Sequence, residues 1–351
     1  MQIPRRFALG VPRFVLLGLI AFLALLAITA CDDNFEPSSA EGGDHSEEDL
    51  SGQQLNGQNF TKQKLVNTDM SGTNVDGSFF IAVDMSGANL SGASVVNANF
   101  ASSILAGADL TNLTGNNPDF EGADLEGVDF TGAQLVGPDL EEANLTGLIA
   151  PGVSFTGAEL DGATGRGANF EGADLTGTDM SRGAMPETNL LHATLKDVTG
   201  TSTELTGSNA DEGDWTNCNF TWGILQRVSF VRTQLTGCTF TGADFTGADL
   251  GGAQLVSANL TGANLNKATM PDSNFAQANL NATNFTETDL RRVNFGNANL
   301  TDADFSNANL NEADLTGANL TNTNLENANL DAVKWDDGTI WPFGFDPPPR
   351  P

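Results

Sequence analysis

The sequence contains no tyrosine, only two histidines and three cysteines, and just 15 lysines and arginines against 45 aspartates and glutamates. So few cysteines exclude a fold held by a framework of disulfides, which occurs in short, cysteine-dense chains. Two histidines leave little room for a histidine-based catalytic or metal site. The net charge of −30 excludes binding of DNA or RNA through a basic surface. We therefore predict that the protein is not an enzyme, has no cofactor and does not bind nucleic acid directly.

The first thirty residues have the order of an export signal. Three arginines precede an uncharged apolar run at 14–30, as in a secretory signal peptide. The run is followed by Cys31 in the sequence Ile-Thr-Ala-Cys, which resembles the lipobox of bacterial lipoproteins. This resemblance implies cleavage before Cys31 and acylation of its sulfur. The alternative is an uncleaved anchor, because an apolar run of this length reaches the lower limit for spanning a membrane.

Either alternative places the chain behind the signal on the extracytoplasmic side of a membrane. With residues 1–30 as the signal peptide, the mature protein would be held at the cell membrane by a lipid on Cys31. Residues 31–49 contain eight acids and almost no apolar side chain. Such a composition cannot bury a core, so we expect a disordered, acidic spacer there.

One five-residue period runs from Leu50 to Ile340. Large apolar residues occupy the positions divisible by five, with only five exceptions. The exceptions are Gly115, Ala150, Gly165, Gly200 and Ala210. Neither the helix period of 3.6 nor the strand period of 2 produces this pattern. The chain is therefore predicted to be a tandem repeat.

The other positions of each repeat indicate a corner between short extended segments. The residue two before the apolar one is small, and the residue directly before it is usually Asn or Asp. Glycine is the commonest residue two positions after it. Glycine there supplies the positive φ that a type II turn requires at its third residue. Each repeat is thus predicted to form one short strand and one tight turn.

The unit Ala-(Asn/Asp)-(Leu/Phe)-x-Gly recurs almost unchanged, as in 123–127 and 243–247. It resembles the unit of the pentapeptide-repeat protein family over most of the chain. The resemblance implies an all-β fold, a right-handed quadrilateral β-solenoid with four repeats per coil. We expect one uninterrupted solenoid of about 14 to 15 coils at 50–341, followed by a proline-rich tail at 342–351.

The repeat also predicts particular contacts inside the rod and at its C-terminal end. A stack of rings twenty residues apart is expected in the core, from Phe60, Phe80, Phe100 and Phe120. The end of the solenoid needs a cover for its unpaired backbone. We expect this cover to come from Trp335, Ile340, Trp341, Phe343 and Phe345. Where the repeat is least regular, at 196–215, we favour mutual repacking of small and large residues over an outward bulge.

Cys218 and Cys238 fall on the small, inward-pointing position of two adjacent coils. Stacking in register sets their β-carbons about 4.8 Å apart, whereas a relaxed disulfide needs about 3.8 Å. We therefore predict two buried free thiols and no disulfide.

Seven acidic residues are expected to share one strip on the surface. Four of them precede an apolar residue at successive intervals of twenty, and three follow two residues later on the same strands. They are Asp119, Glu121, Asp139, Glu141, Glu159, Asp161 and Asp179. Side chains two apart on a strand point the same way. The strip is either a solvated surface screened by salt or a site for divalent cations or a basic partner, and no metal is firmly assigned to it.

Two main classes of function stay open. The first is a non-enzymatic, lipid-anchored extracytoplasmic rod with a structural or protein-interaction role, whose partner would be basic. The second follows from the resemblance, because some pentapeptide-repeat proteins mimic DNA and bind gyrase or topoisomerase. B-DNA carries one charge per about 1.7 Å, whereas residues 50–351 carry a net charge of −25 over a rod on the order of 70 Å. This thinner charge favours the first class; binding of divalent cations at the surface is a further alternative.

Changing Cys31 to Ser should leave an unprocessed precursor without lipid, because the processing enzyme acts only on the acylated cysteine. Mass spectrometry of the protein from the native membrane measures this. Retention of Met1 with no lipid in the unchanged protein would favour the uncleaved anchor instead.

Overall fold

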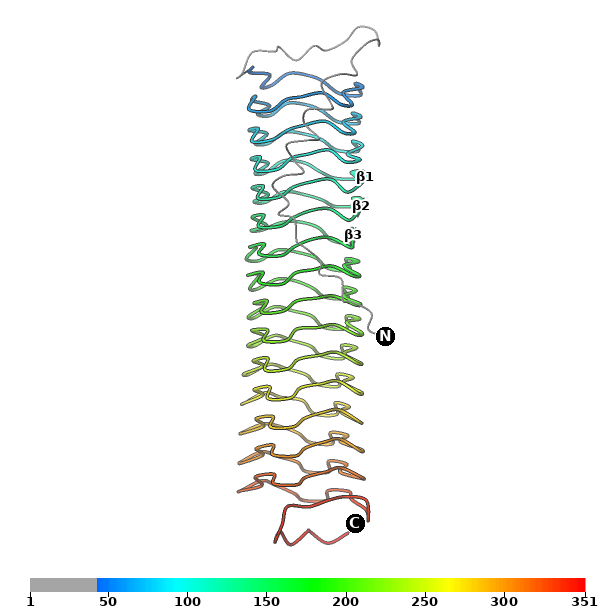
Figure 1. The fold of residues 1–351 in the computed structure, drawn as a ribbon, viewed down its shortest axis with the longest axis vertical. Helices are drawn as coiled ribbons and strands as arrows, with labels where there is room; N and C mark the ends of the chain where they lie inside the picture. The colour runs from blue at the N-terminus through cyan, green and yellow to red at the C-terminus, as the bar shows by residue number, and fades with distance from the viewer. Residues whose placement is uncertain (1–42, 351) are drawn as a thin grey trace, which may run out of the picture. The chain divides into compact units, whose positions relative to one another are not determined.

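The computed structural model describes residues 43–350, which lie in one compact unit, Pro37–Pro351. The chain winds into stacked coils (Figure 1). Pairings recur every five residues with a period of twenty, so each coil has four sides and the fold is a quadrilateral β-solenoid. Each coil takes twenty residues, and adjacent coils pair in parallel, from Asp44↔Lys64 to Asp314↔Lys334. The register continues without a shift past 115, 165 and 200, as predicted.

Most of the strand segments are so short that one residue pairs with each neighbouring coil. Three are longer: β1 (Thr114–Asn116), β2 (Gln134–Val136) and β3 (Ser154–Thr156). They form a parallel sheet in the order β1-β2-β3 (Figure 1). Gly115 pairs with Leu135, and Leu135 with Phe155. A missing side chain at 115 therefore leaves the backbone pairing intact.

The corners of the coil share one backbone conformation. Every residue two positions after an apolar centre has a positive φ, from Glu47 to Ala332, whether it is glycine or not. The N–H of Gln63 donates to the carbonyl of Phe60 at 2.9 Å, and the same bond closes most other corners. These are the features of a type II turn, so the predicted corner is confirmed. Because many corners carry other residues at a cost of roughly 1–2 kcal/mol each, the coil imposes this conformation and glycine only eases it.

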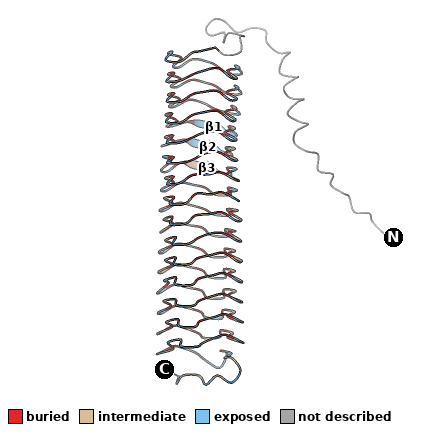
Figure 2. Ribbon diagram, turned by 90° about the vertical axis from the view of Figure 1, so that its left-hand side faces the viewer, coloured by how far each residue is buried: buried red, intermediate tan, exposed pale blue. Residues whose placement is uncertain are grey.

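Buried positions recur in every coil along the rod (Figure 2), and the large apolar residues at these positions form one continuous core. The rings of Phe60, Phe80, Phe100 and Phe120 stack with centroids 4.9, 4.8 and 5.0 Å apart. The predicted ladder of rings is thus confirmed. Each ring lies directly over the previous one because the coils stack in register.

The irregular stretch at 196–215 is filled by mutual repacking, as favoured from the sequence. A β-carbon at Gly200 would overlap the ring of Phe220, so the missing side chain makes room for this phenylalanine. A β-carbon at Gly213 would lie 2.9 Å from the indole nitrogen of Trp215. Trp215 is fully buried, and the coils there keep their pairing, as Thr199↔Asn219 shows.

The solenoid begins earlier than predicted. Parallel pairing starts at Asp44, within the stretch that was expected to be a disordered spacer. His45 takes an apolar centre position, where its side chain is 13% exposed and its Nδ1 lies 3.2 Å from Glu48 Oε2. The expectation failed because it assumed that an ordered coil needs apolar side chains. This first half-coil is polar, and its backbone is held by hydrogen bonds such as that from His45 N to Lys64 O at 2.9 Å. The rest of the spacer and Cys31 lie outside the described residues.

The cover of the C-terminal end was predicted only in part. Trp341 packs edge-on against Trp335, with centroids 5.8 Å apart, and stacks on Phe345 at 5.3 Å. Ile340 and Phe343, however, are 52% and fully exposed. The last pairing, Asn319↔Ile340, spans 21 residues. This extra residue moves Ile340 to an outward position, which the unbroken five-residue count did not reveal.

The prediction of free thiols is wrong: Cys218 and Cys238 form a disulfide between adjacent coils. Their α-carbons are 4.6 Å apart, within the range that a disulfide spans. The prediction fixed both β-carbons at the spacing of ideal coils. The α-carbons lie close to the ordinary spacing of adjacent coils, so the side-chain conformations, which the sequence does not give, bring the sulfurs together.

Restoring the repeat at position 200 should destabilise the protein. Gly200→Leu would force the new side chain against the Phe220 ring and cost about 1–3 kcal/mol of overpacking. In a Phe220→Leu background the same change should cost much less, because that ring is gone. Urea unfolding of the four proteins measures the coupling. An equal cost in both backgrounds would contradict the repacking of Gly200 around Phe220.

Candidate functional site

The seven predicted acids lie together on one side of the solenoid. We call this side A; its strands are centred on Phe60 and on every twentieth residue to Leu320. Asp119 pairs with Asp139, Asp139 with Glu159, and Glu159 with Asp179, so four acids stack on consecutive coils. The other three lie two residues further on the same strands, and all seven are half-buried or exposed. We refer to the seven as the acidic strip.

The same outward position holds asparagine in many other coils, where it forms a ladder. Asn279 Nδ2 donates to Asn259 Oδ1 at 3.3 Å, and Asn299 Nδ2 donates to Asn279 Oδ1 at 3.0 Å. Each amide oxygen also accepts the N–H two residues later, as from Thr261 to Asn259 at 3.2 Å. Each asparagine therefore accepts a hydrogen bond from a backbone N–H of its own strand and donates one to the asparagine of the coil before it.

The acidic strip retains only half of this arrangement. Asp139 Oδ1 accepts the N–H of Glu141 at 3.1 Å, so the bond within the strand is kept. A carboxylate has no N–H to donate to the next coil, so the stacked acids face one another across the coils without that bond. The amide of Asn99 donates to Asp119 Oδ2 at 2.7 Å and thus serves one end of the strip.

Burial and repulsion raise the pKa of three carboxyls in the strip. For Asp119, burial is the larger cause and the charge of Asp139 adds to it. Burial is also the first cause for Glu121 and Glu141, followed by the charges of neighbouring acids. The ionised strip is therefore electrostatically unfavourable, and cations or protons would relieve it.

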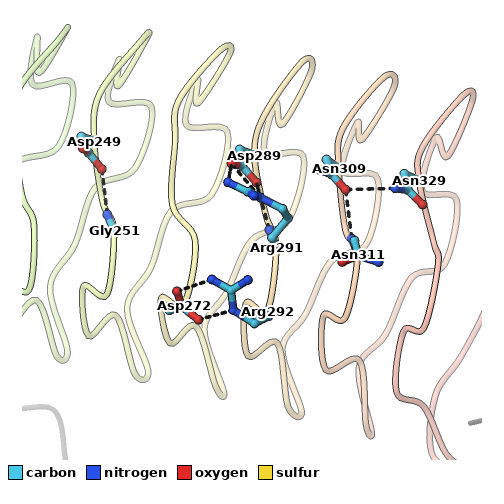
Figure 3. A network of polar contacts seen from close by, with 9 residues as sticks. All are labelled: Asp249, Gly251, Asp272, Asp289, Arg291, Arg292, Asn309, Asn311 and Asn329. Atoms are coloured by element: carbon cyan, nitrogen blue, oxygen red, sulfur yellow. Dashed lines mark hydrogen bonds and ion pairs between the residues drawn. The ribbon is translucent and has the colours of Figure 1, made fainter.

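Only one acid of the strip has a basic partner among residues 43–350. Arg182, at the adjacent corner, forms a bidentate pair with Asp161. Elsewhere on the rod, a minority of the acids pair with bases within or between coils. Arg291 binds Asp289 on its own strand, and Arg292 binds Asp272 of the previous coil at 2.6 and 2.7 Å (Figure 3). Most acids elsewhere on the described part of the rod also form no salt bridge, so what distinguishes the strip is the stacking of four acids on consecutive coils.

The middle of the strip brings three carboxylates close enough to share a cation. One oxygen from each of Asp139, Glu141 and Glu159 lies within 4.8 Å of the other two. Oxygens bound to one Ca²⁺ at 2.3–2.6 Å lie at most about 5 Å apart. The sequence predicted these residues in one strip, but the convergence of these three depends on side-chain conformations that only the structure gives.

Sequence reasoning missed the exposed apolar residues near the strip. Phe79 and Ile81 are 38% and 36% exposed on side A, two coils before Asp119. Trp222, at a corner of side A beyond the strip, is 63% exposed. Phe79 could have been found from the sequence, because it is an aromatic residue at the outward position usually held by Asn or Asp. In residues 43–350 no helix has the length and apolar character needed to cross a membrane.

Comparison with known protein families agrees with this fold. The family model described as "Pentapeptide repeats (8 copies)" matches 84–114, 116–147, 152–182 and 298–334, and "Pentapeptide repeat region" matches 228–305. Together the matches cover more than half of the sequence. The chain belongs to the pentapeptide-repeat family. The fold predicted from the resemblance is therefore confirmed.

Solved structures of other pentapeptide-repeat proteins are similar to this chain. Rfr23 from the cyanobacterium Cyanothece 51142 is 35% identical over 26% of this chain and 63% of its own, with a TM-score of 0.26. The match therefore spans less than two thirds of Rfr23. HetL from Nostoc sp. strain PCC 7120 is 22% identical over 76% of this chain and 92% of its own, with a TM-score of 0.18.

A third similar structure is QnrB1, a plasmid-mediated fluoroquinolone resistance protein. It is 16% identical over 50% of this pentapeptide-repeat chain and 94% of its own, with a TM-score of 0.21. No curated protein matches the sequence.

Removing charge from the strip should stabilise the protein at neutral pH. We expect Asp119→Asn with Glu121→Gln and Glu141→Gln to raise the melting temperature by a few degrees at pH 7. Relief of each like-charge pair contributes about 0.2–1 kcal/mol, and about 1 kcal/mol shifts a protein of this size by roughly 2–4 °C.

The gain should shrink as the pH falls. A pKa raised by folding means that the native state binds protons more tightly than the unfolded state. The corresponding stability is present below the ordinary carboxyl pKa and is lost as the pH rises through the raised values. Calorimetry at pH 7 and pH 4 measures this, with Glu126→Gln, Asp129→Asn and Glu171→Gln as a control of equal charge change. A gain independent of pH, or equal in the control, would contradict the repulsion.

Proposed function

We propose that this pentapeptide-repeat protein is a non-enzymatic rod, held by a lipid on Cys31 at the extracytoplasmic side of the cell membrane, that binds a basic protein through the acidic strip. The observation that carries the proposal is the unneutralised strip. Six of its seven acids form no salt bridge with any base in the part of the chain that the structure describes, and four of the seven stack on consecutive coils.

Binding of a basic partner would remove an unfavourable interaction as well as add a favourable one. Lysines or arginines placed along the strip would offset the repulsion that, together with burial as the larger cause, raises the pKa of Asp119, Glu121 and Glu141. A concentrated negative field also speeds the encounter with a basic surface. Phe79 and Ile81, exposed on the same side A, offer an apolar contact next to the charges.

Two observations support the extracytoplasmic address. The sequence before residue 31 has the order of a lipoprotein signal. The disulfide between Cys218 and Cys238 is a feature of proteins that fold in an oxidising compartment, because cytosolic thiols are kept reduced.

The alternative of DNA mimicry has less support. QnrB1 is by its name a fluoroquinolone resistance protein, but its likeness to this chain lies in the fold alone. A gyrase-binding protein must be cytosolic, so cell fractionation separates the two functions.

Proximity labelling in the native cell envelope tests the proposal. The label is fused to the C-terminus of the full chain, and three proteins are compared. The first is unchanged and the second has all seven strip acids replaced by Asn or Gln. The third, as control, loses seven acids on other sides: Asp109, Asp124, Glu126, Asp129, Glu171, Asp174 and Asp249.

We expect the unchanged and control proteins to label a common set rich in basic envelope proteins. The strip variant should lose this set. Equal labelling by all three would exclude the strip as the binding surface. Recovery of the unchanged protein in the cytosol would exclude the address and favour the gyrase alternative.

A divalent cation is the second candidate ligand of the strip. It is favoured by the convergence of Asp139, Glu141 and Glu159, since Ca²⁺ binds carboxylate oxygens. A bound cation would stabilise the native state by mass action. Thermal unfolding with and without millimolar calcium should then show a rise in melting temperature that is absent in the strip variant. No rise, or the same rise in both proteins, would exclude this candidate.

A further inference from the structure

Trp222 is an aromatic side chain that lies outside the core. It is 63% exposed, whereas Trp215 is fully buried and Trp335 and Trp341 are partly covered in the C-terminal cap. It occupies a corner with φ of 59°, where glycine is the commonest residue. Its ring lies over Gly242 in the next coil, because a β-carbon at 242 would overlap the indole. The flat indole ring of Trp222 therefore lies on the outer surface of the rod.

On side A, the surface beside this ring carries no charge, whereas Glu204 and Asp244 lie on the following side, in the coils before and after Ile224. From residue 199 to 321, the outward positions of side A hold only threonine and asparagine, all of them half-buried, in seven consecutive coils. We call these residues the neutral face. They are Thr199, Thr201, Asn219, Thr221, Thr239, Thr241, Asn259, Thr261, Asn279, Asn281, Asn299, Thr301, Asn319 and Thr321. The chain has a net charge of −30. On this uncharged face a ligand meets no carboxylates that would repel it or that it would have to neutralise.

The ladder of amides is interrupted next to Trp222. In the later coils Asn279 and Asn299 each donate an N–H to the asparagine before them. In the three coils around Trp222 this position holds Thr199, Asn219 and Thr239, which pair through their backbones in register. The hydroxyls of Thr199 and Thr239 and the Nδ2 of Asn219 make no hydrogen bond to any described residue. Donors on three adjacent coils are thus left for a ligand.

We propose that the neutral face is a binding surface for a neutral polysaccharide, with Trp222 as its stacking platform. A pyranose ring presents C–H groups on its face, which pack on an indole, and hydroxyls around its rim. Those hydroxyls both donate and accept hydrogen bonds, as do the threonine hydroxyls and the asparagine amide beside the indole. An extended sugar chain lying along side A would meet the free donors of these three adjacent coils, and further uncharged hydroxyl and amide groups on the coils that follow.

The chemistry of the face argues for this occupant over others. A polymer with carboxylate or phosphate groups would be repelled by the net charge of the protein. A protein partner usually needs an apolar centre of several residues. Here the next exposed apolar residue, Ile224, lies past the corner on the following side. The site also differs in place and chemistry from the acidic strip, and its binding does not depend on the lipid anchor or on a basic partner.

Titration of the purified full-length protein with three uncharged hexasaccharides tests the proposal. The probes are cellohexaose, chitohexaose and maltohexaose, followed by isothermal calorimetry and tryptophan fluorescence. We expect at least one probe to bind and to shift the emission of the exposed indole. Trp222→Ala should weaken that binding at least tenfold, while Trp222→Phe should retain part of it. Val136→Ala, which trims another exposed apolar residue (53%) away from side A, should bind as the unchanged protein does.

Two further measurements keep the result clear. Unchanged melting temperatures of the Trp222 variants exclude unfolding as the cause of lost binding. Raising the salt concentration from 50 to 500 mM should leave the affinity unaltered, because a neutral ligand releases no counterions, whereas binding of a basic partner at the strip should weaken. Absence of binding by all three probes, equal affinity of Trp222→Ala, or loss of binding in high salt would overturn the proposal.

Discussion

The parallel pairing of each coil with the coil twenty residues later is the constraint on which the rest of this structure depends. Backbone bonds such as Phe60 N to Phe79 O, at 2.8 Å, recur at almost every coil. They place each side chain over its counterpart at the spacing of adjacent strands. Whatever residue type the sequence repeats at intervals of twenty therefore becomes a continuous stack along the rod.

Stacking in register has opposite consequences for different side chains. Phenylalanines gain ring contacts, as between Phe80 and Phe100, and asparagines gain a hydrogen bond from coil to coil, as between Asn279 and Asn299. Aspartate and glutamate gain neither, and their charges repel. The acidic strip therefore lacks the contacts from coil to coil that stabilise stacked phenylalanines and asparagines elsewhere on the rod. Its retention of four stacked acids is the physical reason to look for a ligand there.

The regular backbone also explains how the rod tolerates departures from its repeat. Each coil contacts mainly the coils next to it, so a change in side-chain volume is absorbed locally. The ring of Phe220 fills the space left by the missing side chain of Gly200 in the adjacent coil. Cys218 and Cys238 link two coils covalently. Neither alters the register. Even Trp222 rests on the surface without disturbing the corner beneath it, because Gly242 supplies the space.

The sequence by itself determined the architecture, because a period of five with an apolar residue at each fifth position is compatible with few folds. It also placed the acids of the strip on one side, since positions twenty apart must stack. The tertiary structure decided what depends on exact positions and local deviations. These are the polar first coil at His45, the extra residue before Ile340, the disulfide, and the convergence of Asp139, Glu141 and Glu159. Periodicity fixes which residues are neighbours, but distances of a few tenths of an ångström and side-chain rotamers decide whether neighbours bond, repel or leave a group free for a ligand.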